Sequence, residues 1–260
     1  MLTGLLKIIG VYKVYAKWLN GQVKKSVMPR HVGVILDGNR RWAAERTLAI
    51  AEGHMQGAKT GESFLDWCLG LGIKIVTVYA FSAENFRRSR SEVNDILAII
   101  EQEALHLESD PIIHEKKIRV KALGRLDYLP DRLREIVQRL EQATKNYDKH
   151  YLNIAVAYGG REEIVDAAKK IAEDVKSQRI SVDKIDENLF MQYLYTSHLP
   201  NPYPDLIIRT SGEERLSGFL LWQSAYSELC FIDVWWPDFR KIDLLRAIRT
   251  YQKRVRKFGR

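Results

Sequence analysis

Six short runs of apolar and β-branched residues alternate with longer amphipathic patterns, and this order restricts the folds that the chain can adopt. The runs start at residues 31, 73, 118, 151, 205 and 229, and each is typical of a strand buried on both faces. Helical patterns cover residues 91–108, 129–147, 159–176 and 241–255. The alternation predicts a single-domain α/β fold with a mostly parallel six-stranded sheet flanked by helices.

The residues that directly follow four of these runs are rich in arginine, glycine and small hydroxyl side chains. Ligands of open parallel sheets bind outside the carboxyl ends of the strands, so we expect these loops to form one crevice. Guanidinium groups, hydroxyls and exposed backbone N–H groups all bind phosphate oxygens. A solvated turn explains any one loop taken alone. The loops read DGNRRW from Asp37, SAENFRRS from Ser82, GGR from Gly159 and RTSGEERLS from Arg209.

Several phosphate and metal chemistries are excluded by missing motifs. The chain contains neither G-x-x-x-x-G-K-[ST] nor G-x-G-x-x-G, which disfavours P-loop and dinucleotide-binding functions. Its two cysteines stand far apart in apolar runs, and no histidine cluster has the spacing of zinc ligands. A Mg²⁺ ion held by a carboxylate and substrate phosphates therefore remains, with Asp37 as its candidate ligand. The formal charge of +8 fits phosphorylated small molecules, nucleic acid or an anionic membrane equally well.

The N-terminal segment is apolar but is interrupted by lysines. No run approaches the length of a membrane-spanning helix, and no cleavage pattern indicates a signal peptide, so we expect a cytoplasmic protein. The helical spacing predicts an amphipathic helix that either packs on its own domain or associates with a membrane surface. The apolar residues with this spacing are Leu5, Ile8, Ile9, Tyr12, Tyr15 and Trp18.

An ordered set of segments resembles the cis-prenyltransferases, the undecaprenyl diphosphate synthase family. The resemblance covers the chain after residue 29, and the DGNRRW wording and the extra N-terminal segment are closest to archaeal members. It divides the chain into an N-terminal amphipathic extension, residues 1–28, and a catalytic domain, residues 29–260. The segments are HVGVILDGNRRWA, EGHMQGA, VTVYAFSAENFRRS, NIAVAYGGREEI, IIRTSGEERLSGFLLWQSAYSELCFIDVWWPDF and RKFG.

The resemblance implies a transferase. An allylic diphosphate, farnesyl or geranylgeranyl diphosphate, would be elongated with isopentenyl diphosphate in Z geometry, with release of diphosphate and formation of a long-chain polyprenyl diphosphate. The family uses Mg²⁺, forms homodimers and accommodates the growing chain in an apolar tunnel. Residues 91–107 are the candidate tunnel wall, with Val120, Ala122 and Leu123 as further candidates.

The resemblance also assigns roles to residues. Those implied as catalytic are Asp37, His54, Asn85 and Arg88; Asp37 also binds the metal, together with Glu228 from across a dimer interface. Gly38, Asn39, Arg40, Arg41 and Trp42 match the allylic site, Ser82 the isopentenyl diphosphate site, and Arg209, Arg215 and Ser217 its diphosphate clamp. Phe81 and Phe86 match aromatic positions beside the reacting carbons, although both also fit an ordinary core, and Lys257–Gly259 resembles a tail that reaches the partner's site.

The chain departs from the family pattern at several positions. Ile50 replaces a common arginine, so one allylic phosphate contact is either missing or supplied by Arg46 or Arg40. An accessory subunit of the same fold, or one with an unusual acceptor, is the alternative function. A nucleic-acid-binding protein is suggested only by the charge, and trans-prenyltransferases are excluded because the chain has no adjacent aspartates. The other departures are Phe86, Ser89, Gly218 and Lys257.

Overall fold

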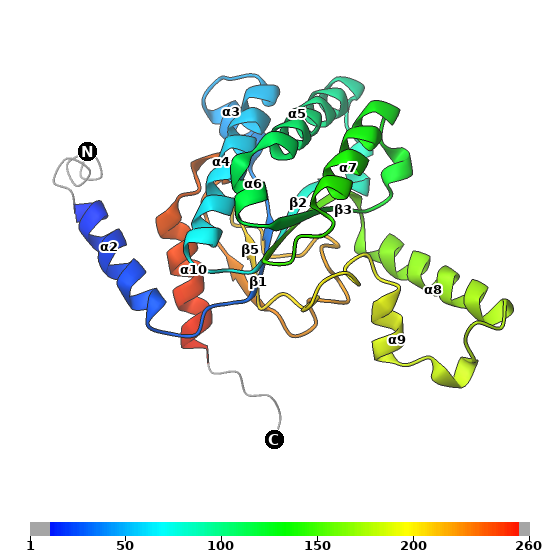
Figure 1. Ribbon diagram of the computed structural model, residues 1–260. Coiled ribbons are helices and arrows are strands. Elements are labelled where there is room, and N and C mark those ends of the chain that lie inside the picture. Colours follow the sequence, from blue (N-terminus) through cyan, green and yellow to red (C-terminus); the bar gives the residue numbers. More distant parts are fainter. Residues whose placement is uncertain (1–10, 255–260) are drawn as a thin grey trace.

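The computed structural model describes residues 11–254, and its centre is a six-stranded sheet (Figure 1). The strand order is β3-β4-β2-β1-β5-β6, and every neighbouring pair is parallel, which confirms the predicted sheet. The strands are β1 (His31–Ile35), β2 (Ile75–Ser82), β3 (Ile118–Leu123), β4 (His150–Tyr158), β5 (Leu206–Arg209) and β6 (Glu228–Phe231).

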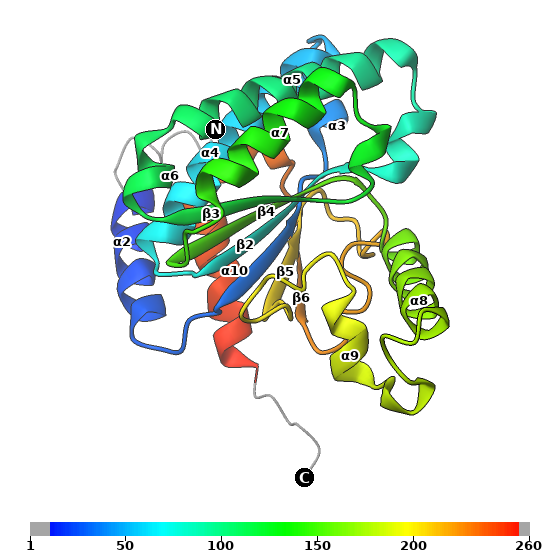
Figure 2. The same ribbon diagram turned by 45° about the vertical axis from the view of Figure 1, so that its right-hand side comes forward.

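Helices cover both faces of this sheet (Figures 1 and 2). Helices α4 to α7 lie over one face, and α8 and α9 lie on the other side. The longest helix, α4, has no counterpart in the predicted helices. The α-helices are α2 (Val11–Lys24), α3 (Asn39–Glu45), α4 (Ile50–Gly70), α5 (Arg90–Ser109), α6 (Pro111–Glu115), α7 (Asp131–Thr144), α8 (Gly160–Lys176), α9 (Glu187–Gln192) and α10 (Lys241–Lys253).

Strand β1 is buried along its whole length because both faces of the sheet are covered. Val32 and Val34 belong to the larger core cluster, which includes side chains of α4, α5, α7 and α10. Ile35 packs into a second cluster with Phe219. An uninterrupted apolar run is the sequence pattern expected for such a strand.

The N-terminal helix α2 packs against α10. Leu19 and Val23 are fully buried, and the Gln252 side-chain amide donates a 2.9 Å hydrogen bond to the Val23 carbonyl oxygen. Trp18, on the outer face, remains 51% exposed. One face of the helix thus packs on its own domain; the predicted apolar positions before residue 11 lie outside the described residues, as does the Tyr12 side chain. No described helix is long and apolar enough to cross a membrane.

A row of buried polar side chains crosses the sheet. His31 Nε2 lies 2.8 Å from Thr77 Oγ1, and Asn153 links Thr77, at 3.0 Å, to His198, at 2.9 Å. Burial lowers the pKa of His31 to about 4, against the opposing charge of Asp205. Burial, with the charges of Lys121 and Arg119, lowers the pKa of His198 to about 4. Both imidazoles are therefore neutral in the native protein at pH 7.

Acid is expected to destabilise the fold through these two histidines. A histidine with a native pKa near 4 and an unfolded pKa near 6.5 binds protons mainly when unfolded, so its contribution is present above pH 6.5 and decreases as the pH falls toward 4. Each would reduce the free energy of unfolding by about 2 kcal/mol between pH 7 and pH 5. Urea unfolding at both pH values measures the change, which His198→Gln should reduce by about half; a constant free energy of unfolding would contradict the assignment.

Candidate active site

A crevice of about 600 Å³ opens where β1, β2 and β5 end, at the edge of the sheet predicted from the sequence. The loop after β4, residues 159–161, was also expected here but does not line the crevice. The crevice contains four arginines, two carboxylates and the His54 imidazole. Eleven of the predicted site residues line it: Asp37, Gly38, Asn39, Arg40, Arg41, His54, Ser82, Asn85, Arg88, Arg209 and Ser217.

Asp37 and Arg209 form an ion pair inside this crevice. Arg209 Nη2 lies 2.7 Å from Asp37 Oδ2, and Arg41 Nη2 lies 3.5 Å from Oδ1. Thr210 holds the Asp37 backbone: its hydroxyl accepts from the Asp37 N–H at 3.0 Å and donates to the Asp37 carbonyl at 2.7 Å. The pairing arises because Arg209 ends β5, which lies beside β1 in the sheet.

The Asp37 carboxylate is ionised at neutral pH. Burial acts to raise its pKa, but the hydrogen bond and charge of Arg209, together with the charge of Arg41, outweigh burial and lower it below the usual range. The carboxylate is also part-exposed to the crevice, with 28% of the side chain accessible. An ionised, accessible oxygen donor suits a hard cation such as Mg²⁺.

Arg209 is fixed by further contacts on the far side of its guanidinium group. Nη1 donates to Ser217 Oγ at 2.8 Å and to the Arg215 carbonyl oxygen. Its buried Nε has no hydrogen-bond partner among the described residues. Only 5% of the residue is exposed, yet Arg209 lines the crevice, where these contacts hold its guanidinium group beside Asp37.

Gly38 turns the chain from β1 into α3. Its φ is +106°, a conformation that favours glycine, and a Cβ atom there would lie 2.8 Å from Cδ1 of Trp235. Helix α3 then packs against α4, where a Cβ at Gly53 would lie 2.4 Å from the Asn39 carbonyl oxygen. Asn39 is therefore positioned by the absence of a side chain on the facing helix.

Gly53→Ala is expected to move α3 and damage the crevice, because the added carbon meets backbone rather than a flexible side chain. We expect a loss of about 2 kcal/mol in stability and at least a tenfold loss of kcat/KM. Gly70→Ala is the matched control on the same helix: nothing lies within 4 Å of its Cβ, it lines neither the crevice nor the cavity beside it, and it should be neutral or stabilise by up to about 1 kcal/mol. Thermal unfolding and steady-state kinetics measure both; equal behaviour of the two variants would refute the packing argument.

The loop after β2 carries a second group of charged and polar side chains. Asn85 Oδ1 accepts from the Ser82 N–H at 2.9 Å, which closes the loop onto itself. Arg88 Nη1 donates to Glu92 Oε1 at 2.7 Å, and His54 Nε2 lies 3.6 Å from the same oxygen. Glu92 was not predicted as a site residue. Ser89 and Glu92 have the S-x-x-E spacing that is common at the start of a helix. This pattern does not indicate contacts with α3 and α4.

Five predicted residues do not line the crevice. Phe81 and Phe86 pack edge-to-face at 4.9 Å within an apolar cluster, as the core interpretation expects. The Arg215 guanidinium pairs with Glu213 at 2.5 Å, and Trp42 packs under the guanidinium of a neighbouring arginine. Glu228 is the first residue of β6 and pairs with Leu206, at the amino end of β5. Asp37 follows the carboxyl end of β1, so Glu228 and Asp37 of the same chain lie at opposite ends of the sheet, and Arg254 pairs with Glu228 there. Residues 257–259 lie outside the described residues.

Ile50 lines the crevice where the family pattern has an arginine. Arg46 does not replace that arginine, because its guanidinium pairs with Asp238 at 2.9 Å and Glu45 at 3.1 Å. Arg40 does line the crevice. Of the two substitutes considered from the sequence, Arg40 is the one in position to contact a phosphate.

An apolar cavity adjoins the crevice. It lies among α4, α5, α7 and the strands β2 to β4, and Leu36, Asn39, His54, Ala80 and Ile96 line both spaces. Two of the candidate tunnel residues, Val120 and Ala122, line this cavity, whereas Leu123 does not. Many of the predicted wall residues on α5 face it, namely Ile96, Ile99, Ile100, Glu103, Ala104 and Leu107.

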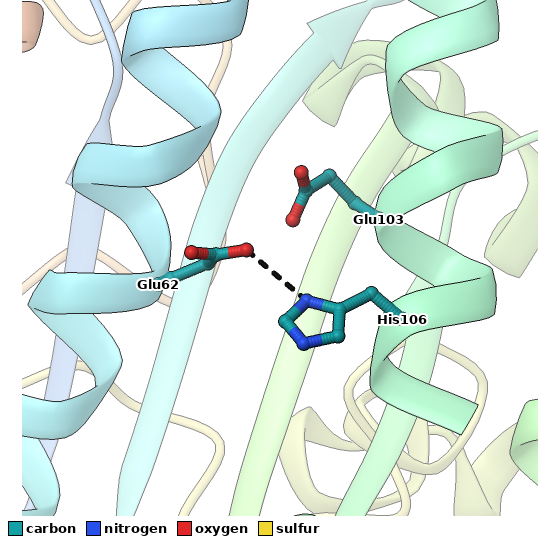
Figure 3. A group of neighbouring side chains, drawn as sticks. All are labelled: Glu62, Glu103 and His106. Atoms are coloured by element: carbon teal, nitrogen blue, oxygen red, sulfur yellow. Dashed lines mark hydrogen bonds and ion pairs between the residues drawn. The ribbon is translucent and has the colours of Figure 1, made fainter. Parts of the chain in front are cut away.

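A polar cluster lies in the gap between α4 and α5 (Figure 3). Glu62 extends from α4, and Glu103 and His106 extend from α5; His106 Nδ1 lies 3.1 Å from Glu62 Oε1. Burial, and after it the negative charge of Glu62, raises the pKa of Glu103. One ligand atom from each side chain lies within 4.8 Å of the others, so this is a second place, apart from Asp37, where described side chains could hold a cation.

Comparison with known proteins identifies close relatives. A family model described as "Putative undecaprenyl diphosphate synthase" matches residues 35–259. A Methanopyrus kandleri protein named tritrans,polycis-undecaprenyl-diphosphate synthase (geranylgeranyl-diphosphate specific) is 54% identical over 96% of this chain and 92% of its own length. A Thermoplasma volcanium protein of the same name is 53% identical over 95% of each chain.

Solved structures agree with this similarity. Lavandulyl diphosphate synthase from Lavandula x intermedia, in complex with dimethylallyl diphosphate, superposes with a TM-score of 0.85 and 39% identity over 90% of this chain and 99% of that one. A probable undecaprenyl diphosphate synthase from Campylobacter jejuni gives a TM-score of 0.72 and 30% identity over 90% and 100% of the respective chains.

Proposed function

Because the chain belongs to the undecaprenyl diphosphate synthase family of cis-prenyltransferases, we propose that it elongates geranylgeranyl diphosphate with isopentenyl diphosphate in Z geometry. Each cycle releases diphosphate and lengthens the polyprenyl diphosphate by five carbons. One observation carries the proposal: a crevice that contains four arginines adjoins an apolar cavity and shares five lining residues with it. Such a site suits a molecule with an anionic head and a long hydrocarbon tail.

The crevice residues support the binding of two diphosphates side by side. Arg40 and Arg41 follow β1 and suit the allylic diphosphate, whereas Arg209 and Ser217 suit that of isopentenyl diphosphate. Guanidinium groups in a partly dehydrated site stabilise the negative charge that develops on the leaving diphosphate.

Asp37 would hold a Mg²⁺ ion beside the allylic diphosphate. Its carboxylate is ionised and accessible, and hard cations favour oxygen ligands of this kind. The ion supplies charge neutralisation for the departing diphosphate. Arg209 now occupies one Asp37 oxygen, so we expect the guanidinium to turn toward a substrate phosphate when both ligands bind.

The apolar cavity would accommodate the growing hydrocarbon chain. Its lining includes Ile96, Ile100 and Val137, which exclude water from a reactive allylic cation. His54 and Asn39 line both spaces, so the reacting carbons would lie near them, with the diphosphates on one side and the chain on the other.

Initial rates with two starters test the function. Labelled isopentenyl diphosphate is supplied with geranylgeranyl or farnesyl diphosphate, in Mg²⁺ or in EDTA, and butanol-extractable product is counted. We expect Mg²⁺-dependent product and a higher kcat/KM with geranylgeranyl diphosphate, the starter in the names of the relatives. Faster elongation of farnesyl diphosphate would contradict the starter assignment, and no product with either starter would favour an accessory role.

A homodimer would complete the site. Glu228 lies on the edge strand β6, where Arg254 Nη1 holds it at 2.5 Å, and in one chain it is remote from the crevice. A partner chain could bring this carboxylate toward the metal. Sedimentation of the purified chain tests the assembly: a dimer at micromolar concentration is expected, and a fully active monomer would overturn it.

The outer face of α2 would contact an anionic membrane. Val14 is 71% exposed and Trp18 is 51% exposed, and the Arg249 guanidinium lies 5.6 Å from the Trp18 ring centroid. Apolar side chains beside cations suit an anionic lipid interface. Trp18→Glu should weaken cosedimentation with anionic vesicles while elongation of a detergent-dispersed substrate continues; unchanged cosedimentation would exclude this contact.

A further inference from the structure

Glu92 connects three predicted site side chains from three different elements: Arg40, predicted to bind substrate, and His54 and Arg88, predicted as catalytic. Its Oε1 lies 2.7 Å from Arg88 Nη1, in the segment that joins η1 (Ala83–Arg87) to α5. The same oxygen lies 3.6 Å from Arg40 Nε, on α3, and 3.6 Å from His54 Nε2, on α4. These side chains all line the crevice, whereas Glu92 does not.

Local structure holds the Glu92 carboxylate in place. Ser89 caps α5, and its hydroxyl accepts from the Glu92 N–H at 3.3 Å, so Glu92 lies in the first helical turn. A negative charge is favourable there because the first turn presents unpaired N–H groups. Only 7% of the Glu92 side chain is exposed, so its charge is weakly screened.

The three side chains need such a counter-charge when no substrate is bound. Arg40 and Arg88 would repel each other, and both lower the pKa of His54, after burial, whereas Glu92 raises it. One carboxylate cannot neutralise both guanidinium groups, so this side of the crevice keeps a net positive charge and can still attract a diphosphate. The Glu92 carboxylate can therefore orient these three side chains without cancelling the positive charge of the two arginines.

We propose that Glu92 is a positioning residue for elongation: its carboxylate orients Arg40, His54 and Arg88 toward the two diphosphates without contacting substrate. The proposal rests on the cis-prenyltransferase activity proposed above. Arg40 belongs to the allylic side and Arg88 to the isopentenyl side, so Glu92 fixes the two diphosphate sites relative to each other. Misplacement by about 1 Å can reduce a rate by about 100-fold.

Glu92→Gln tests this role, with Glu101→Gln as the matched control. Glu101 lies on the same helix and pairs with Arg132 at 2.9 Å, away from the crevice. In Glu92→Gln we expect kcat to fall by about 100-fold and KM for isopentenyl diphosphate to change by less than about threefold, since loss of the carboxylate leaves attraction for anions intact. Unchanged kcat, or a rise in KM alone, would overturn the proposal.

An NMR titration of the His54 imidazole gives a readout that does not depend on activity. The charged groups facing His54 are Glu92, Arg88 and Arg40, so Glu92→Gln should lower its pKa further, while Glu101→Gln should leave it unchanged. Glu92→Asp keeps the charge on a shorter side chain and should give a smaller loss of kcat, which keeps the test valid if the glutamine variant unfolds. An unchanged His54 pKa in Glu92→Gln would refute the positioning role, whereas an inactive wild type with the expected shift would refute only the proposed function.

Discussion

Asp37→Asn is expected to reduce kcat by about 1,000-fold or more, the largest effect of any single change at the crevice. The amide keeps the size of the side chain but loses the ionised oxygen that would hold Mg²⁺, and it leaves the 5%-exposed Arg209 guanidinium without its carboxylate partner. Charge on the leaving diphosphate would then be poorly neutralised. Single-turnover incorporation of labelled isopentenyl diphosphate at saturating Mg²⁺ measures the loss.

Asp238→Asn is the control for Asp37→Asn. It removes an aspartate that pairs with Arg46 at 2.9 Å outside the crevice, so its kcat should stay within about twofold of the wild type. Thermal unfolding shows whether Asp37→Asn remains folded. Full activity of a folded Asp37→Asn protein would contradict the assignment of Asp37 as the Mg²⁺ ligand.

Arg209→Ala is expected to raise KM for isopentenyl diphosphate by about 100-fold, with a smaller change in kcat. Arg209 lines the crevice, where its Nη1 and Nη2 are held by Ser217 and Asp37. Arg209→Lys should recover little, because an ammonium group cannot reproduce the planar arrangement of donors. Initial rates measure these constants: one series varies isopentenyl diphosphate at saturating starter, and a second varies the starter at saturating isopentenyl diphosphate.

Arg139→Ala provides the comparison for Arg209→Ala. Its guanidinium pairs with Glu108 on the surface at 3.1 Å, and we expect kinetic constants close to those of the wild type. A large rise in KM for the allylic starter, with the KM for isopentenyl diphosphate unchanged, would assign Arg209 to the other diphosphate.

The sheet could be predicted from the sequence because each strand is a short, continuous apolar run. Strand β3 was predicted with the observed bounds, and most of the others differ at their ends by one or two residues. The run predicted for β6 continued five residues past Phe231, where that strand ends. Helix α4 was missed because glycines at positions 53, 57, 61 and 70 weaken a helical pattern. Gly53 and Gly57 lie against Asn39, a contact with a residue of another helix that single-sequence patterns cannot indicate.

The crevice could be predicted because parallel strands bring their carboxyl ends to one edge. Asp37 and Arg209 are 172 residues apart, yet they meet because β1 and β5 are neighbours. Side-chain direction was harder to predict: Phe81 and Phe86 point into the core, and the guanidinium of Arg215 pairs locally while its carbonyl binds Arg209. Glu92 was missed because two of its three contacts, with Arg40 and His54, come from helices that are distant in the sequence.

The most direct test of the proposed elongation reaction is the product that the protein forms. The purified chain is incubated with geranylgeranyl diphosphate, labelled isopentenyl diphosphate and Mg²⁺, and both released diphosphate and the geometry of each new double bond are determined. We predict one diphosphate released per isopentenyl unit incorporated, with every added unit in Z geometry. A folded protein that releases diphosphate without chain growth, or that adds units in E geometry, would contradict the account.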